Sequence, residues 1–145
     1  MIGAPIWQRN WLAVRPPGAV RIELGRSPVA RSAARREVRD LPADTPVVLF
    51  AAAPAAASRC RRFASRTGVQ LEREYLAFPS AAAPGCLVED APGTIRVFIR
   101  TVLIAPPRTA LAPIIDLAFR LIRGLGSWRL IRTLAPGRVV VGRRA

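Results

Sequence analysis

The first eighty residues change repeatedly between two hydrophobic periodicities. Alternation of apolar and polar residues over 19–24 and 69–78 predicts two strands, and the continuous apolar run 46–51 predicts a third strand covered on both faces. Apolar residues recur every three or four positions over 28–41 and 54–67, which predicts a helix in each range. Strands that alternate with helices across short turns favour parallel crossovers. We therefore expect an α/β fold with a small, mainly parallel sheet, flanking helices and a cleft at the rim of the sheet.

The helix predicted over 54–67 separates its faces clearly. Its core-facing positions, spaced three and four residues apart, are Cys60, Phe63, Ala64 and Thr67. The adjacent face carries Arg59, Arg62 and Arg66. Gly68 stands where a left-handed residue commonly ends a helix, so we expect the helix to end there.

The helix predicted over 28–41 begins with a recognisable cap. Ser27 suits the N-cap, and Pro28 suits the first helical position. The buried side is predicted to consist of Ala30, Ala34, Val38 and Leu41. The solvent side is predicted to consist of Arg31, Arg35, Arg36 and Arg39.

Two later segments allow alternatives. Residues 94–105 are rich in β-branched side chains, which favour a strand, but their apolar positions also fill a complete helical template, and we expect a helix. Residues 109–123 predict a helix with only a narrow polar stripe. We expect this helix to be buried; the alternative is an interfacial helix that lies on a membrane beside Trp128, supported by neighbouring arginines.

The remaining segments complete the predicted domain. Trp7 and Trp11, at helical spacing, either cap the core or form an exposed surface that meets another domain. Residues 86–88 favour a short edge strand, and residues 138–141 favour a final strand. We expect one domain over 1–145, made of an N-terminal extension (1–18), a βαβαβ unit (19–80) and a mostly helical part with a terminal strand (81–145).

Composition excludes much of the enzyme repertoire. The 145 residues contain no histidine and no lysine, which removes Ser-His and Cys-His catalysis, histidine metal sites and Schiff-base chemistry. The two cysteines lack the further soft ligands of a zinc site, and we expect no metal site. The net charge of +14 comes entirely from arginine and favours association with polyanions, although GC-rich coding also produces such a composition.

Nothing in the chain predicts export or membrane insertion. Polar residues at positions 8–10 interrupt the N-terminal apolar stretch, unlike a signal peptide. No window reaches the roughly 20 apolar residues that span a bilayer. We therefore expect a cytoplasmic protein without a transmembrane segment.

The turn after the first strand is the best candidate for a small-ligand site. In parallel α/β sheets, ligands bind beyond the carboxyl ends of strands, where helix N-termini offer free amides to anions. The residues at this position are Gly25, Arg26, Ser27 and Pro28; the alternative is plain turn chemistry. A polyanion is instead predicted to bind the two basic helices through Arg31, Arg35, Arg59 and Arg62.

Carboxylates and thiols supply further candidates, each with a structural alternative. Glu72 and Glu74 share one face of a predicted strand and either divide acid and base roles or are neutralised by arginines such as Arg66 and Arg73. The adjacent acids at positions 89–90 either coordinate a hard cation or form a solvated turn, which we expect.

Cys60 is flanked by arginines, which favour a reactive thiolate, yet its place on the apolar face favours an inert buried thiol, as we expect. A disulfide between Cys60 and Cys86 is not expected in a cytosolic protein.

Several segments carry a Pro-Gly or Gly turn followed by a strand. Residues 15–25 (RPPGAVRIELG) and 134–144 (LAPGRVVVGRR) resemble the Leu-x-Pro-Gly-Gly turn and late strand of class I S-adenosylmethionine-dependent methyltransferases. Residues 61–80 are similar to the C-terminal helix, turn and strand of that family. Alternatively, residues 20–28 (VRIELGRSP) resemble the start of the family's cofactor motif, an alignment that excludes the first one over the same residues.

The resemblance implies a Rossmann-like fragment: a truncated or degenerate methyltransferase-like accessory domain, bound to a larger protein subunit. It implies S-adenosylmethionine as the cofactor, near Glu23, Gly25 and Ser27. The sequence departs from the family pattern because Ser27 and Val29 replace further glycines, and no catalytic residue is carried over. The alternatives are a non-enzymatic arginine-rich module that binds RNA or an anionic membrane surface, and a small enzyme with a carboxylate site.

Overall fold

A computed structural model describes residues 6–101, 113–114, 117, 120–121, 124 and 128–145. The chain divides into two units. One unit consists of Met1–Leu87 and Ala135–Ala145, and the other of Val88–Leu134. The arginine-lined groove described below belongs to the first unit.

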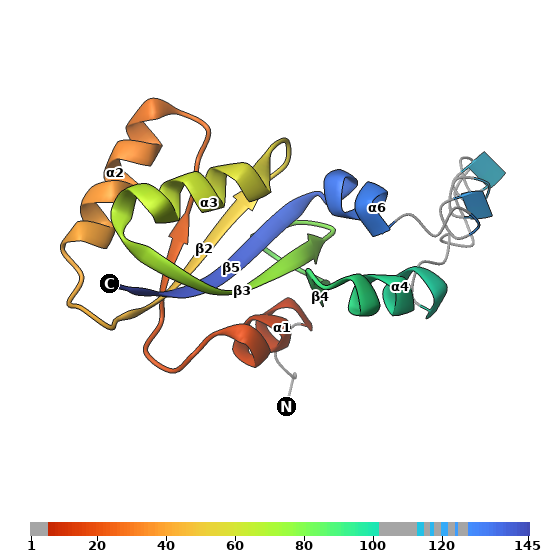
Figure 1. The fold of residues 1–145 in the computed structure, drawn as a ribbon, viewed down its shortest axis with the longest axis horizontal. Helices are drawn as coiled ribbons and strands as arrows, with labels where there is room; N and C mark the ends of the chain where they lie inside the picture. Colours follow the sequence, from red (N-terminus) through yellow and green to blue (C-terminus); the bar gives the residue numbers. More distant parts are fainter. Residues whose placement is uncertain (1–5, 102–112, 115–116, 118–119, 122–123, 125–127) are drawn as a thin grey trace. The chain divides into compact units, whose positions relative to one another are not determined.

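The chain folds around a mixed five-stranded sheet of order β1-β2-β5-β3-β4 (Figure 1). Its strands are β1 (Val20–Glu23), β2 (Pro46–Ala52), β3 (Val69–Phe78), β4 (Cys86–Glu89) and β5 (Gly137–Arg144). β1 pairs with β2 in parallel, as predicted, whereas β5 is antiparallel to both β2 and β3. The expectation of a mainly parallel sheet is therefore wrong.

The position of β5 explains the difference. Because β2 and β3 are both antiparallel to β5, they run in the same direction, and the two predicted crossovers exist. The C-terminal strand lies between them and converts a parallel neighbour pair into two antiparallel pairs. The residues Val139, Val140 and Val141 are buried, which suits a strand at the centre of a sheet.

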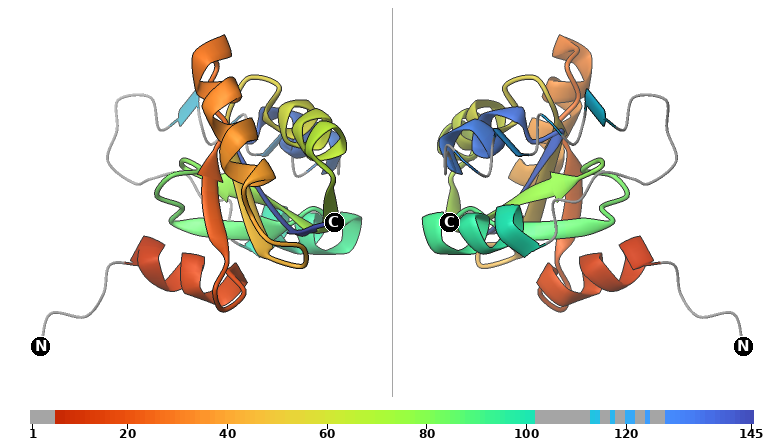
Figure 2. Two further views of the ribbon diagram at one scale, coloured as in Figure 1. Left: turned by 90° about the vertical axis from the view of Figure 1, so that its left-hand side faces the viewer. Right: turned by 90° about the vertical axis from the view of Figure 1, so that its right-hand side faces the viewer.

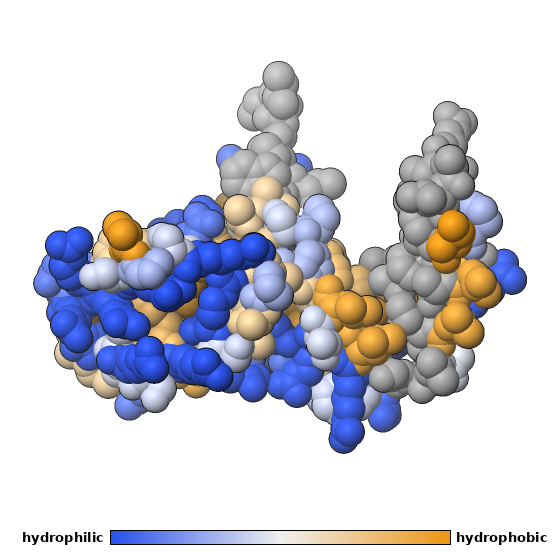
Figure 3. Space-filling view, turned by 90° about the horizontal axis from the view of Figure 1, so that it is seen from above, coloured by the Kyte–Doolittle hydropathy of each residue, from blue (hydrophilic) through white to orange (hydrophobic). Residues whose placement is uncertain are grey.

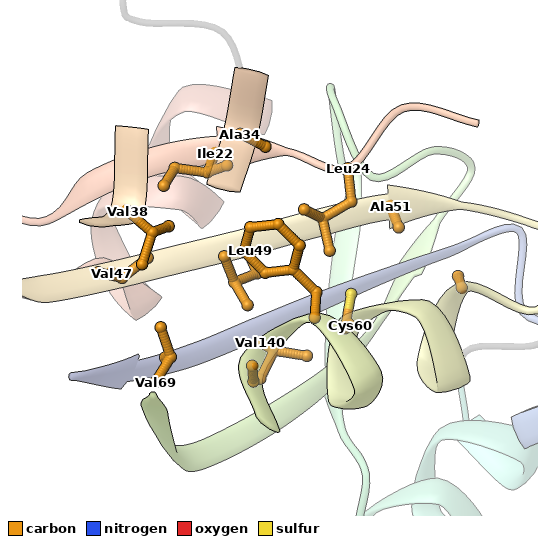
Figure 4. Packing of buried hydrophobic residues seen from close by; sticks show 13 residues of the cluster. Ile22, Leu24, Ala34, Val38, Val47, Leu49, Ala51, Cys60, Val69 and Val140 are labelled. Carbon is orange, nitrogen blue, oxygen red and sulfur yellow. The ribbon is translucent and has the colours of Figure 1, made fainter. Parts of the chain in front are cut away.

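Helices cover both faces of the sheet within the first unit. Figures 1 and 2 show α2 (Pro28–Arg39) and α3 (Ala56–Thr67) on one side and α1 (Ile6–Val14) on the other. The core under α2 and α3 joins the apolar faces of both helices to β1, β2 and β5 (Figure 4). As predicted, the buried face of α3 contains Cys60, Phe63, Ala64 and Thr67.

The predicted helix boundaries have local causes. The Ser27 hydroxyl accepts a hydrogen bond from the amide of Ala30 at 3.1 Å and caps α2, as predicted. Gly68 ends α3 with φ +70°, a conformation that suits a residue without a Cβ. Both confirm the positions that the sequence predicts for the turns around α2 and α3.

The predicted alternation along β3 is wrong in its second half. A register shift between Leu71 and Arg73 interrupts the pairing with β5, and Tyr75, Leu76 and Ala77 are all buried. At this irregularity, a Cβ on Gly142 of β5 would lie 2.2 Å from the carbonyl oxygen of Gln70. The close approach of the two backbones therefore requires glycine at position 142.

On the opposite face of the sheet, Trp11 is buried and belongs to the core, which confirms the capping alternative for this residue. Its indole packs edge-on against Phe50 with ring centroids 5.4 Å apart, and its Nε1 donates to the carbonyl of Ala82 at 3.1 Å. The side chain of Trp7 lies outside the part that the structure describes.

The second unit contains α4 (Pro92–Thr101) and α6 (Trp128–Leu134), which pack against each other. The helix expected over 94–105 is confirmed as far as Thr101, and residues 102–105 lie outside the described part. Its inner face consists of Ile95, Phe98 and Ile99. Arg132 of α6 donates to the buried carboxylate of Asp90 at 2.9 Å.

The expectation that segment 109–123 is buried is wrong for the apolar residues described there. Ile114, Leu117 and Leu121 are exposed, whereas Asp116 and Arg123 lie outside the described part. Within the described ranges, no helix has the length and apolar character needed to cross a bilayer.

Candidate anion-binding groove

A groove of about 260 Å³ lies between α2 and α3. Figure 3 shows hydrophilic side chains gathered over these helices around a hollow with a more hydrophobic floor. The groove is lined by Leu24, Arg31, Arg35, Arg59, Arg62, Phe63 and Arg66. Five of the seven lining residues are therefore arginines, and these include all four arginines predicted to bind a polyanion.

Helix geometry explains why these arginines gather. Arg31 and Arg35 are one turn apart on α2, and Arg59, Arg62 and Arg66 follow the i, i+3, i+7 spacing of one face of α3. Each helix therefore contributes one row of guanidinium groups, and the rows face the same groove.

The predicted solvent side of α2 needs a correction. Arg36 and Arg39 are exposed, but Arg31 and Arg35 are half-buried, because they lie at the border of the apolar face that packs toward α3. Helical periodicity alone does not distinguish a residue at this border from one on the outer face.

The floor of the groove is apolar and closely packed. Leu24 is 3% exposed and Phe63 is 5% exposed, and both belong to the core cluster under the two helices (Figure 4). Charges above an apolar floor are less well solvated than charges on an open surface, and their attraction for an anion is correspondingly stronger.

Backbone carbonyls at or just beyond the carboxyl ends of β1 and β2 hold two of the groove arginines in place. Arg59 donates to the carbonyl of Leu24 at 3.5 Å and to that of Ala52. Arg31 donates to the carbonyl of Arg26. These neutral acceptors fix the guanidinium groups without neutralising them, so the groove keeps its positive charge.

Within the described part of the chain, no carboxylate balances this charge. Among the residues that the structure describes, no carboxylate oxygen lies within 4.0 Å of any of the five groove arginines. In addition, the Nε atoms of Arg35 and Arg59 are buried without a hydrogen-bond partner. A buried donor on a cation is costly to leave unpaired. An anion in the groove would therefore both balance the positive charge and supply acceptors for unpaired donors.

The residues predicted to bind a cofactor lie beside this groove, in and before the turn that follows β1, but none of the three lines it. Ser27 caps α2 with its hydroxyl, and Glu23 is exposed. A Cβ on Gly25 would lie 2.7 Å from that of Ala30, so glycine at this position allows the turn to pack closely against α2.

The strand carboxylates have partners. Glu72 accepts from Arg143 at 2.9 Å, and Glu74 accepts from Arg61 at 2.7 Å and lies 3.9 Å from the buried Arg138. The neutralised alternative is thus confirmed, and Arg61, Arg138 and Arg143 are among the partners. These partners escape prediction because they come from α3 and from the inserted strand β5.

The thiols and acidic pairs show no reactive arrangement. Burial, and then the charge of Glu74, raises the pKa of Cys60 to about 12, which favours the inert thiol. Burial also raises the pKa of Cys86, and both cysteines are free. Within the described part of the chain, no three metal-ligating side chains form a cluster.

Comparison with known proteins gives no match: no family model matches the sequence, no curated protein matches it, and no solved structure matches the fold. The resemblance to methyltransferases therefore stays a prediction from the sequence.

Proposed function

We propose that this chain is a non-enzymatic module that binds RNA through its phosphates in the groove between α2 and α3. The proposal depends on one observation: the five arginines that line the groove have no carboxylate partner among the described residues. Arginine binds phosphate with two parallel charge-assisted hydrogen bonds, so it suits this ligand better than it suits a diffuse negative surface.

RNA fits the groove better than a membrane surface does. The arginines surround a concave space, whereas the headgroups of a bilayer present a nearly flat plane to a docking protein. The aromatic ring at this site, Phe63, is 5% exposed and offers no platform on which a base stacks. Contacts made only to phosphates carry no sequence information, so binding is expected to be insensitive to base sequence.

Fluorescence anisotropy of labelled single-stranded RNA tests the proposal. The double variant Arg62→Gln/Arg66→Gln removes two exposed groove arginines, and Arg36→Gln/Arg39→Gln removes two exposed arginines of α2 outside the groove. We expect the first pair to weaken binding and the second to leave it nearly unchanged. An equal loss of RNA affinity in the two double variants would show that RNA binding depends on net charge rather than on the groove.

A parallel sedimentation assay addresses the membrane alternative. Vesicles of phosphatidylserine and phosphatidylcholine are mixed with the protein in the presence and absence of RNA. The groove would be assigned to an anionic membrane surface instead if the protein bound vesicles through Arg62 and Arg66 and did not bind RNA.

A second candidate, a Rossmann-like accessory domain related to methyltransferases, is supported by the parallel pair β1–β2 and by the turn at its carboxyl end. Calorimetric titration with S-adenosylmethionine tests it. This candidate is supported if the titration gives saturable heat and the heat disappears when a bulky residue replaces Gly25. The variant must keep the circular dichroism spectrum of the unaltered protein. Absence of heat at millimolar cofactor removes this candidate. A larger subunit as partner is part of the same proposal.

A further inference from the structure

We infer, building on the proposed function, that the groove selects a terminal phosphomonoester of an RNA strand, such as a phosphorylated 5′ end. The terminal phosphomonoester would contact Arg35 and Arg59, the two half-buried groove arginines whose Nε donors have no partner. The phosphodiesters that follow would contact the exposed guanidinium groups of Arg62 and Arg66.

The burial of the unpaired donors favours a protruding acceptor. The Nε atoms of Arg35 and Arg59 are inaccessible to solvent and have no partner, and both residues line the groove. An internal phosphodiester is flanked by sugars on both sides, and only its two non-bridging oxygens carry its charge. A terminal phosphomonoester projects from the chain and offers three strong acceptor oxygens, so it enters the groove beside these half-buried arginines more easily.

The concentration of charge favours the same ligand. Five guanidinium groups surround about 260 Å³ of space. A phosphodiester places one negative charge in that space, whereas a phosphomonoester carries about −1.5 to −2 at pH 7. The terminal group therefore neutralises more of the local positive charge than any internal phosphate of the same strand.

The titration of the ligand gives this proposal a distinct signature. The groups facing the groove from α2 are Arg31 and Arg35, and those from α3 are Arg59, Arg62 and Arg66. Leu24, which contributes from the turn after β1, does not titrate, and the chain contains no histidine. Arginine stays charged at all relevant pH values, so a change in affinity between pH 5 and 7.5 reports the second ionisation of the phosphate near pH 6.

The test compares two RNA oligonucleotides of one sequence, labelled at the 3′ end and carrying either a phosphate or a hydroxyl at the 5′ end. At pH 7.5 we expect the phosphorylated RNA to bind at least about tenfold tighter, because its terminal group adds about two charges. At pH 5.0 only about one tenth of the terminal phosphate remains dianionic, so the preference should fall about tenfold. The affinity of the hydroxylated RNA should change little over this range.

Variants separate the terminal phosphate from the rest of the strand. Arg35→Gln should remove the preference for the phosphorylated end, and Arg35→Lys, which keeps the charge but loses Nε, should reduce it. Arg62→Gln/Arg66→Gln should weaken both RNAs alike and keep their ratio. The ratio should also be unchanged in Arg36→Gln/Arg39→Gln, which lies outside the groove.

The outcomes distinguish this inference from the proposed function. Equal affinity for the two RNAs at pH 7.5 overturns the selection of the 5′ end and leaves RNA binding intact. Absence of binding to both overturns both proposals. If a nucleoside 5′-monophosphate binds as tightly as the phosphorylated RNA, phosphomonoester recognition is supported and RNA as the ligand is overturned.

Discussion

The salt dependence of RNA binding offers a quantitative test of the groove. The test variant is Arg62→Gln/Arg66→Gln, and the control variant is Arg36→Gln/Arg39→Gln. All four side chains are exposed, and each double variant lowers the net charge from +14 to +12. Each pair also includes cations of the last turn of its helix, Arg66 in α3 and Arg36 and Arg39 in α2, so the effects on helix stability are similar in kind. The pairs differ in whether they line the groove.

The expected magnitude follows from counterion release. Each phosphate neutralised on a single strand contributes about 0.7 to the slope of log affinity against log salt. Removal of two groove contacts should therefore make the slope shallower by about 1.4. When salt rises from about 50 to 200 mM, the affinity of Arg62→Gln/Arg66→Gln should fall about sevenfold less than that of the unaltered protein. The slope of the control variant should equal that of the unaltered protein.

The assay is fluorescence anisotropy of the phosphorylated RNA at four or more salt concentrations, fitted for each variant. Circular dichroism spectra and unfolding temperatures establish that both variants fold. If both double variants change the slope equally, the arginines act as a general positive surface, and the groove has no special role. If neither changes it, the phosphates bind elsewhere.

Three further outcomes test the fold around the groove. Iodoacetamide at pH 8 should modify Cys86 much faster than Cys60 in the native protein, as measured by mass spectrometry, because Cys60 stays protonated. The free energy of unfolding should fall as pH rises above 9.0, because the Cys60 thiol ionises there in the unfolded chain but keeps its proton in the folded protein until about pH 12. A Cys60→Ala variant should lack this part of the pH dependence. Gly142→Ala should destabilise the protein by about 1–3 kcal/mol, since its Cβ would collide with the carbonyl of Gln70, and chemical denaturation measures the change. Gly93→Ala, where nothing lies within 4 Å, should be neutral or stabilising, and equal losses in the two variants would contradict the packing at position 142.

Local patterns predict the elements of this chain well because the causes of those elements are local. The cap at Ser27, the left-handed end at Gly68 and the apolar face of α3 each depend on residues a few positions apart. The same holds for α4, where helical spacing outweighed a high content of β-branched residues. None of these features needs knowledge of the partner against which the element packs.

The errors concern pairings between distant segments. β5 begins 59 residues after β3 ends, and no periodicity in residues 137–144 indicates that it lies between β2 and β3. Its insertion brings Arg138 and Arg143 to Glu74 and Glu72, which explains why these two partners were not predicted. The half-burial of Arg31 and Arg35 has the same origin, because it depends on where α3 packs.

The groove shows how a fold holds like charges together and keeps them available. Some surface arginines elsewhere in the first unit pair with carboxylates, as Arg61 does with Glu74 and Arg143 with Glu72. In the groove, the fixed acceptors are instead backbone carbonyls at or just beyond the carboxyl ends of β1 and β2, such as those of Leu24 and Ala52. A carbonyl orients a guanidinium group as a carboxylate does but leaves its charge unbalanced. The mutual repulsion of the groove arginines is then a cost that an anionic ligand relieves, so a ligand of high charge density binds with the greatest gain.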